Sequence, residues 1–461
     1  MLSNIRDAVR GALITHKGSS HNRKIFAAAV IVGVATVFVK LASLAKELIV
    51  ASTFGRGDDL DALLIAFLVP SIAINIIGGS FNAALIPTFI NVREANGKAS
   101  AQQLFSNAVL LSGVLLIGVS IILAMLAPIM FRYLGSGFSA EKLMLTEKLF
   151  YMLLPILLIN GIATTWGAVL NAGERFALVS LASISVPLVI VVALLSGGKV
   201  WGIWALSVGT VAGFVLEAGI IAWGLRSHGI SIAPRWYGID DNLRQVFKQY
   251  FPMVVGGVLM CSTQLVDNAM AAMLESGSVS ALNYGNRVVA VITGIGATAL
   301  GTAALPYFSK MVAGRDWLAV KSTLRLYLRL IFFTTVPLTL GLVYFSEDLV
   351  GLLFERGAFV KSDTQLVGQV QALFLLQIPF YIALIFLVRL ISALKANHVL
   401  IRVTLVSVVI NILMNYLFMI YLGVAGIALS TSIVIVVSFV YSLILFNKII
   451  NRQTNLVQHS S

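Results

Sequence analysis

Three charged residues, Lys40, Lys46 and Glu47, interrupt a long apolar stretch that reads "VFVKLASLAKELIVAS". An ionised side chain in apolar surroundings is costly unless it faces a partner, a wet cavity or an interface. Lys40 and Glu47 are seven residues apart and share nearly one helix face, while Lys46 lies roughly 120° away. We expect Lys40, in the middle of the stretch, to line a cavity. Lys46 and Glu47 are open to two interpretations: they line the same cavity, or they extend to an interface.

A second group of polar residues lies in the other half of the chain. Gln264, Asp267 and Asn268 form one cluster, and Arg287 follows in "LNYGNRVVAV". Asp267 and Arg287 are expected either to form a structural ion pair or to face a cavity. Arg389, within "IALIFLVRLISAL", is a further embedded base.

The embedded charges have a positive surplus. Five bases fall inside apolar runs, against three acids there and Asp61 at an interface; the bases are Lys40, Lys46, Arg287, Arg329 and Arg389, and the acids Glu47, Glu217 and Asp267. A cavity with surplus positive charge attracts anions, and paired cations suit a phosphate or diphosphate. A carrier of cations would instead need a surplus of buried acids.

The composition identifies the environment of these charges. Apolar residues make up 59% of the 461 residues and charged residues 11%, which indicates an integral membrane protein. The net charge of +13 is assigned to loops facing anionic lipid, and no nucleic-acid partner is expected. The single cysteine, Cys261, excludes an intramolecular disulfide. Residues 1–24 are polar and basic, so we expect no cleavable signal peptide.

Twelve apolar runs are long enough to cross a bilayer, and all should be helices because lipid leaves strand edges unsatisfied. The predicted spans are 25–52, 60–90, 104–130, 148–170, 177–197, 201–225, 248–274, 281–309, 326–354, 368–394, 400–422 and 424–447.

The bases outside these spans are distributed unequally. Of the 32 Lys and Arg residues, five are embedded and seven lie opposite the N-terminus, which leaves 20 on the N-terminal side; the seven are Arg56, Arg132, Lys142, Lys148, Lys199, Arg356 and Lys361. Positive charge accumulates in cytoplasmic loops, so both termini are predicted to be cytoplasmic.

The chain repeats itself at a spacing near half its length. "AALIPTF" at 83–89 matches "TAALPYF" at 302–308, and "WALSVGTVAG" at 204–213 matches "IALSTSIVIV" at 427–436. A parallel repeat of six helices is typical of transporters that rock one half against the other. The predicted fold is therefore an all-α polytopic membrane protein with two six-helix lobes around a V-shaped cavity. Its parts are a cytoplasmic segment 1–24, lobes 25–225 and 248–447, a cytoplasmic linker 226–247 and a tail 448–461.

Catalytic and metal sites are not expected. The five histidines, His16, His21, His228, His398 and His459, all fall in loops or termini. They therefore offer neither a metal cluster nor a membrane-embedded catalytic triad.

Several motifs resemble the MviN/MurJ family of lipid flippases. They are "FVKLASLAKELIVASTFGRGDDLDALLIAFLVP", "FNAALIPTF", "SGSVSALNYGNRV", "ALGTAALPYFSKM" and "LFERGAF", in the family's order from about residue 36 to 445. The resemblance implies two six-helix lobes that move an undecaprenyl-diphosphate-linked glycan across the inner membrane by alternating access. It also implies that Lys40, Lys46 and Arg287 hold the diphosphate and that Asp61 opens the second helix. We expect Asn75, Gln264 and Asn268 to contact sugars, with Glu47, Asp61, Asp267 and Arg389 as supporting charges.

The sequence departs from the family at three points. Lysines replace the usual arginines at 40 and 46, "PSIAIN" has no arginine after Pro70, and the usual Glu-Gly-Ala-Phe reads Gly78-Gly79-Ser80-Phe81. We also expect no counterpart of the family's extra helix pair after the twelfth span. Two glycans therefore stay open: an exopolysaccharide or O-antigen repeat unit, and the peptidoglycan precursor lipid II.

The sequence thus predicts a monomeric flippase of the bacterial inner membrane that catalyses no covalent reaction. Its expected partners are the lipid-linked glycan, the bilayer and enzymes of polysaccharide or cell-wall biosynthesis. No cofactor is expected beyond a coupling ion, for which Na⁺ and H⁺ both stay open. The alternatives are a cation-coupled multidrug exporter and, from another class, a membrane glycan polymerase or ligase.

Overall fold

Helices form every secondary-structure element in the part of the chain that the computed structural model describes. The backbone is described for residues 20–173, 175–303, 311–312, 314, 316–394 and 396–460. Side chains are described at 33, 36–296 and 311–453 within those ranges, apart from 397. The all-α prediction is confirmed for this part of the chain.

The described helices follow one another along the chain with no strand between them. They are α2 (Ser20–Phe54), α3 (Asp58–Leu134), α4 (Ala140–Leu153), α5 (Pro155–Ala172), α6 (Phe176–Ala182), α7 (Ser185–Trp201), α8 (Ile203–Ser227), α9 (Asp241–Ala271), α10 (Ser278–Ala303), α12 (Trp317–Tyr344), α13 (Ser346–Phe354), α14 (Lys361–Leu375), α15 (Ile378–Ala393), α16 (Asn397–Leu422) and α17 (Val424–Ser460).

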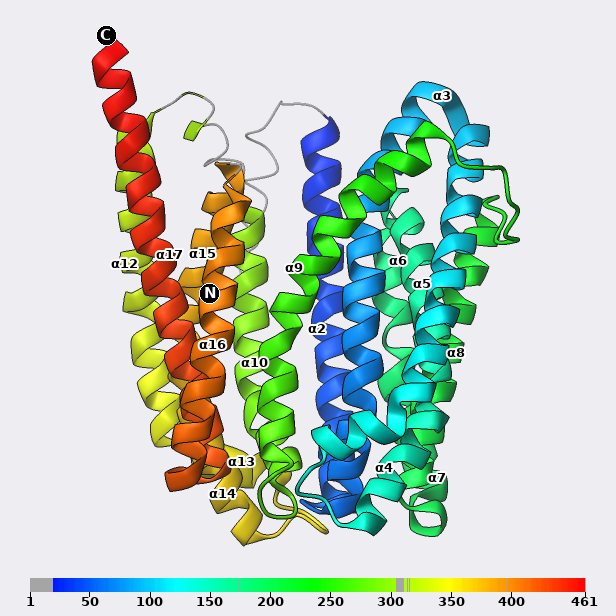
Figure 1. Ribbon diagram of the computed structural model, residues 1–461, viewed down its shortest axis with the longest axis vertical. Helices are drawn as coiled ribbons and strands as arrows, with labels where there is room; N and C mark the ends of the chain where they lie inside the picture. The colour runs from blue at the N-terminus through cyan, green and yellow to red at the C-terminus, as the bar shows by residue number, and fades with distance from the viewer. Residues whose placement is uncertain are drawn as a thin grey trace, which may run out of the picture.

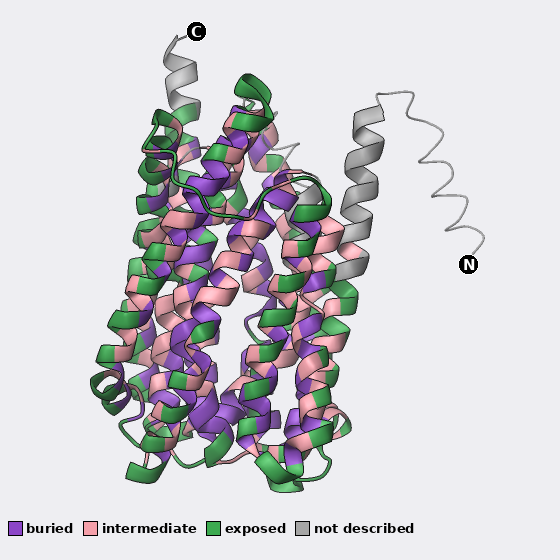
Figure 2. Ribbon diagram, turned by 90° about the vertical axis from the view of Figure 1, so that its right-hand side faces the viewer, coloured by how far each residue is buried: buried purple, intermediate pink, exposed green. Residues whose placement is uncertain are grey.

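Figure 1 shows two helix bundles side by side. The first holds α2 to α8 and the second α10 to α17, while α9 runs obliquely between them. Buried residues follow the helix faces that meet neighbouring helices, as Figure 2 shows for the first bundle. The predicted two-lobed architecture matches this arrangement, whereas the exact domain boundaries stay a prediction.

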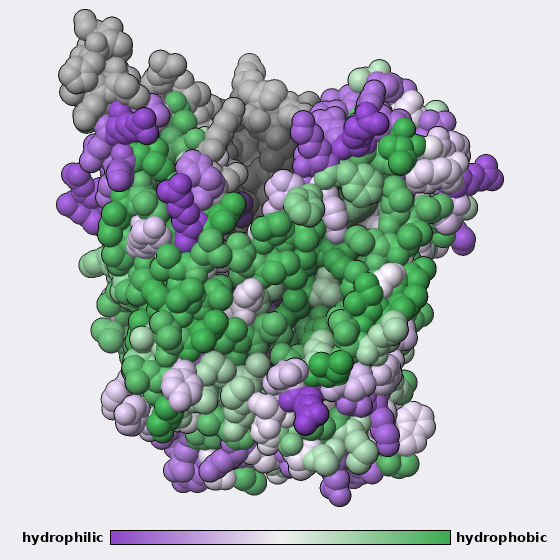
Figure 3. Space-filling view, viewed as in Figure 1, coloured by the Kyte–Doolittle hydropathy of each residue, from purple (hydrophilic) through white to green (hydrophobic). Residues whose placement is uncertain are grey.

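The outer surface carries an apolar band between two polar ends (Figure 3). Large apolar side chains such as Met125, 75% exposed, lie on this surface, which is the arrangement expected where a protein faces lipid rather than water. Among the described residues, eight helical stretches are long and apolar enough to cross a membrane, or nine if the bent pair α14 and α15 forms one span. The multi-pass topology is supported, and the count of twelve spans stays a prediction.

The helices break at several points, two of them beside a glycine or a proline. α3 turns back at Gly97, whose φ of 84° is a left-handed conformation that glycine adopts without steric cost, so its two halves run as separate helices. Pro155 begins a new helix after Leu154, so the predicted span 148–170 is divided between α4 and α5. The predicted span 326–354 is divided between α12 and α13, which meet at Phe345. Residues 1–19 and most of the repeat segment 302–308 lie outside the described residues.

The first half of α9 packs on the first bundle. The Tyr250 ring meets the Phe81 ring edge-on, with centroids 5.7 Å apart, and Leu243 and Val246 join the same buried cluster. The last turns of α9 instead contact α16 and α17 through Asp267. One continuous helix therefore joins the two bundles.

Three side chains of α3 hold the linker that precedes α9. The Gln102 amide pairs with the Ser231 backbone, the Ser106 hydroxyl donates to the Arg235 carbonyl over 2.9 Å, and the Asn107 amide donates to the Gly238 carbonyl over 2.9 Å. Because these bonds satisfy backbone groups that no helix satisfies, they fix the linker on the first bundle.

Candidate substrate-binding site

Lys46, Glu47 and Arg287 meet at the boundary between the bundles. Lys46 Nζ lies 2.7 Å and Arg287 Nη2 lies 2.8 Å from the same carboxylate oxygen, Glu47 Oε1. Lys46 and Glu47 come from α2, whereas Arg287 comes from α10 of the second bundle. A buried carboxylate needs positively charged partners, and each bundle supplies one: Lys46 from the first and Arg287 from the second.

The group keeps positive charge available for a ligand. Two bases and one acid leave a formal charge of +1, and the Glu47 side chain is only 8% exposed. The side chains of Lys46 and Arg287 are 23% and 40% exposed, so each base retains accessible donors. Arg287 Nε is buried without a hydrogen-bond partner. The geometry therefore suits an anion that contacts both bundles at once.

Two cavities adjoin this group. The larger, about 460 Å³, lies within the first bundle, and the smaller, about 250 Å³, reaches α10 of the second. Lys46, Val186 and Phe214 line both cavities, whereas Glu47 and Arg287 line only the smaller one. A ligand held by Lys46 and Arg287 can thus extend into the first bundle.

Asp61, in the first turn of α3, joins the two bundles where α10 begins. Its carboxylate accepts hydrogen bonds from the backbone N–H groups of Gly277 and Ser280, both over 2.7 Å, at the start of α10. Lys142 Nζ, 3.0 Å from the same carboxylate, balances its charge. A carboxylate at a helix N-terminus is stabilised by the unpaired N–H groups there. Asp61 is therefore 1% exposed and fixes α10 to α3.

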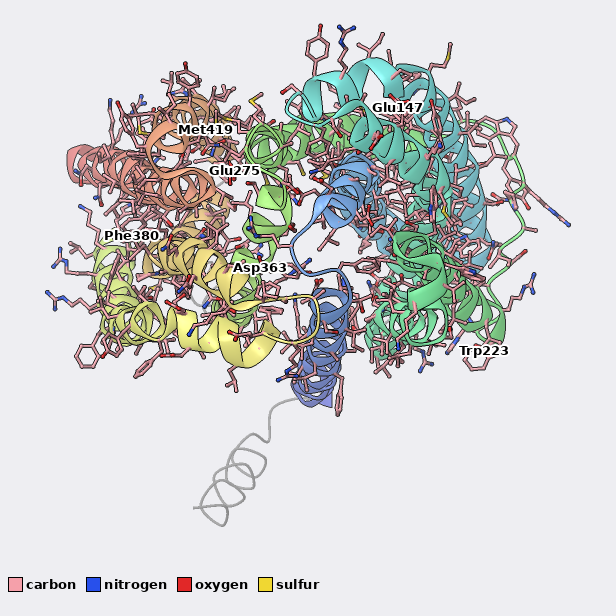
Figure 4. All side chains as sticks on the ribbon, turned by 90° about the horizontal axis from the view of Figure 1, so that it is seen from below. Glu147, Trp223, Glu275, Asp363, Phe380 and Met419 are labelled. Atoms are coloured by element: carbon pink, nitrogen blue, oxygen red, sulfur yellow. The ribbon has the colours of Figure 1, made fainter. Side chains whose placement is uncertain are left out.

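Further contacts close this end. Arg56 Nε donates to Asp363 Oδ1 over 3.1 Å, and Ala358 N–H donates to the Ser52 carbonyl over 2.9 Å. Figure 4, drawn from below, shows Asp363 between the two bundles. Gly357 lies there at φ 62°, and a Cβ atom on it would overlap the Ser52 carbonyl oxygen. The motif "LFERGAF" thus forms part of this closed end.

Asp267 has different neighbours from those expected. The predicted alternative of an Arg287–Asp267 ion pair is wrong, because Arg287 contacts Glu47 instead. Asp267 accepts hydrogen bonds from the Asn411 amide (2.9 Å), the Asn415 amide (2.7 Å) and the Thr431 hydroxyl (3.0 Å). α9, α16 and α17 place these groups together inside the second bundle.

The remaining predicted site residues are more scattered. Lys40, Asn75, Gln264 and Arg389 are exposed, and none lines either of the two cavities. Asn268 is buried, and its Oδ1 accepts a hydrogen bond from the Asn283 amide over 3.0 Å. The sugar contacts proposed for Asn75, Gln264 and Asn268 stay a prediction.

Sequence reasoning missed several polar residues at these sites. Lys142 was assigned to a loop, although its side chain is 7% exposed and lies between Asp58 and Asp61. Asn411 and Asn415 stand four residues apart in an apolar run, a spacing that places two amides on one helix face. That spacing was a usable signal. No comparable pattern indicates Lys142.

Comparison with known proteins identifies the family. A family model described as lipid II flippase MurJ matches residues 50–458. The chain belongs to this family. A probable lipid II flippase MurJ of Rhizobium tropici is 28% identical over 413 residues, covering 87% of this chain and 77% of the relative. Its counterpart in Synechocystis sp. is 27% identical over 417 residues, with the same coverage.

Solved structures share the fold. A lipid II flippase MurJ in an inward closed conformation has a TM-score of 0.79 at 22% identity, covering 91% of this chain and 87% of that chain. An inward-facing multidrug resistance MATE family transporter has a TM-score of 0.76 at 15% identity, covering 93% and 99%. The protein is accordingly a multi-pass transporter of the bacterial inner membrane rather than an enzyme, which confirms the predicted class.

Proposed function

We propose that this protein carries lipid II from the inner to the outer leaflet of the inner membrane. The observation that carries the proposal is the meeting of Lys46 and Arg287, from different bundles, on one oxygen of Glu47 beside a shared cavity. Two bases that face one cavity from opposite bundles suit the diphosphate of a lipid-linked glycan. A diphosphate bound to both bases would link the bundles.

The family supports lipid II over the other glycan considered. The relatives in Rhizobium tropici and Synechocystis sp. are both described as probable lipid II flippases. Nothing in the comparisons supports an exopolysaccharide or O-antigen repeat unit, which the sequence analysis left open. A multidrug exporter is not favoured either, because the MATE structure shares the fold at 15% identity.

The contacts between the bundles support an alternating-access cycle. Asp61, Arg56 and Gly357 close the end that the distribution of basic residues assigns to the outside. The structure then corresponds to a state that receives substrate from the cytoplasm. An inside-negative potential would favour outward movement of an anion by about 2.3 kcal/mol per charge per 100 mV.

The Asp267 cluster is our proposed site for a coupling cation. The side-chain oxygens Asn411 Oδ1 and Asn415 Oδ1 are buried and have no hydrogen-bond partner, beside a buried carboxylate. The Asp267 carboxylate and Thr431 Oγ1 are oxygen ligands of the kind that a small hard cation such as Na⁺ prefers, and the two asparagines would add theirs by turning their amides, whose nitrogens face Asp267. Protonation of Asp267 is the alternative means of coupling.

Flipping assays in proteoliposomes test the substrate. Vesicles with the wild-type protein should expose lipid II to the opposite leaflet, whereas a lipid-linked O-antigen repeat unit should stay where it was loaded. Lys46→Ala and Arg287→Ala should each abolish the lipid II signal while the proteins stay folded. Equal transport of both glycans would refute the assigned specificity, and full activity of both variants would refute the diphosphate site.

A further inference from the structure

The larger cavity, inside the first bundle, has a polar lining that the diphosphate does not account for. Its volume of about 460 Å³ falls within the roughly 300–1,000 Å³ typical of small-molecule sites. Four helices and the residue after α6 supply its hydrogen-bonding side chains, which are Ser43, Lys46, Asn82, Asn160, Thr164, Asn171, Ser183 and Glu217.

This lining suits neutral polar groups rather than a second anion. Lys46 is the only base among the described residues that line this cavity, and it is already paired with Glu47. The Glu217 carboxylate faces the same space and would repel a phosphate. Asparagine amides both donate and accept hydrogen bonds, which matches hydroxyl and acetamido groups.

Three observations support an orientation of these polar groups towards a ligand. Asn82 Oδ1 is buried and has no hydrogen-bond partner among the described residues, although an unpaired buried acceptor is costly. Glu217 Oε1 accepts a hydrogen bond from the Ser183 hydroxyl over 2.7 Å, which fixes the carboxylate. Thr164 Oγ1 lies 2.7 Å from the Asn160 carbonyl oxygen and 3.0 Å from its Oδ1, which fixes this side of the cavity.

Lys46 connects this cavity to the proposed diphosphate site. It lines both cavities, and so does Phe214, whose ring offers an apolar wall for the carbon face of a sugar. A group bonded directly to a diphosphate on Lys46 therefore begins at the mouth of the larger cavity.

We infer that the cavity in the first bundle binds the N-acetylated sugar attached to the diphosphate, with Asn82 and Glu217 as its specificity-determining residues. This inference rests on the proposed function, since the diphosphate on Lys46 positions the sugar. The sugar's N–H and O–H groups donate to Asn82 Oδ1 and to the Glu217 carboxylate. The asparagine pair on α5, Asn160 and Asn171, supplies further donors.

The test compares binding of two lipids to the purified full-length protein. The probes are undecaprenyl diphosphate and undecaprenyl diphosphate bearing one N-acetylhexosamine. Asn82→Leu should weaken binding of the sugar-bearing lipid by about tenfold and leave the bare diphosphate unchanged, since one hydrogen bond to the sugar is lost. Glu217→Gln, which keeps the size of the side chain, should shift binding in the same direction by a smaller factor.

Asn91→Leu is the matched control, because Asn91 is an exposed residue of the same helix and does not line the cavity. It should bind both lipids as the wild type does. Melting temperatures identify any variant that fails to fold, and Glu217→Gln then decides the result if Asn82→Leu is lost. Folded variants that bind both lipids normally, or lose both equally, would overturn the inference. Lys46→Ala tests the proposed function separately: undiminished binding of the bare diphosphate by this variant would refute that function whatever the cavity variants do.

Discussion

Glu47 is the acid on which the two candidate diphosphate ligands converge. Lys46 and Arg287 both contact its Oε1 atom, so each base has an alternative partner when no substrate is bound. Binding of a diphosphate would exchange the carboxylate for phosphate oxygens. Between substrates, the pairing with Glu47 lowers the cost of keeping two bases together within the membrane.

The first prediction concerns the double variant Glu47→Gln with Arg287→Gln. Arg287→Gln alone should lower the free energy of unfolding by about 1 kcal/mol or less, because the guanidinium is partly exposed and Lys46 still neutralises Glu47. Flipping of lipid II should be lost in the single variant and should stay lost in the double variant. Melting temperature and proteoliposome flipping measure the two effects. Transport recovered in the double variant would mean that Arg287 only neutralises Glu47.

The second prediction concerns the buried carboxylate of Asp267. If the cluster binds Na⁺, replacing choline chloride by sodium chloride should raise the melting temperature of the wild type. At a Na⁺ concentration of 100 times Kd, the free energy of unfolding should increase by about 2.7 kcal/mol. Asp267→Asn should abolish the rise because a charged ligand of the ion is removed. Asp348→Asn, at an exposed acid of α13, is the matched control and should keep it. An equal rise in all three proteins would place the ion elsewhere.

Different helices make the different contacts between the two bundles. α2 and α10 carry the charged group between the bundles, whereas α9 packs on the first bundle at its start and on α16 at its end. The closed end depends on short irregular segments, above all residues 55–58 and 355–360. These segments bring backbone groups of the two bundles into contact, as in the hydrogen bond from the Ala358 N–H to the Ser52 carbonyl.

The third prediction tests this closed end through Gly357→Ala. The substitution adds a Cβ at φ 62°, against the Ser52 carbonyl oxygen, at a conformational cost of about 1–2 kcal/mol before any overlap. The closed end should therefore open more often. A cysteine at Val279, which is fully buried there, should react severalfold faster with an impermeant thiol reagent from outside.

Gly219→Ala serves as the control for this experiment. Gly219 has open space around its Cβ position on α8 and lies far along the chain from the closed end. Its replacement should leave the reactivity of the Val279 cysteine unchanged. Unchanged reactivity in Gly357→Ala as well would show that the glycine does not contribute to closure.

At the scale of the whole molecule, the two bundles approach each other at one end, and cavities adjoin the charges farther along α2 and α10. The linker 228–240 is attached to the first bundle by Gln102, Ser106 and Asn107. It should therefore move with that bundle when the bundles separate.

The fourth prediction assigns this linker to the cytoplasmic side. In a Cys261→Ser background, a cysteine at the exposed residue Trp236 should be labelled only after the membrane is permeabilised. A cysteine at the exposed residue Lys361, at the closed end, should be labelled in intact cells. The reversed pattern would contradict the predicted topology and the inward-facing assignment of the structure.

The sequence by itself determined the membrane class, the helical architecture and the embedded charges. These follow from local properties: the length of an apolar run, its helical periodicity and the cost of an ion in lipid. The family motifs also identified Lys46, Arg287 and Asp61 as residues of interest. The turn at Gly97 lies between two predicted spans, whereas the break before Pro155 lies inside one and was not predicted, because a break depends on which neighbouring helix packs there.

Only the tertiary structure decided which charges meet. Arg287 pairs with Glu47, 240 positions earlier in the chain, rather than with the nearer Asp267. Asp61 caps α10 across 216 residues, and Asp267 meets Asn411 across 144. Helical periodicity fixes the face on which a side chain lies, but the packing of the two bundles fixes what that face touches. Ion pairing within a few ångströms is therefore set by the relative position of the bundles, which no local pattern in the sequence specifies.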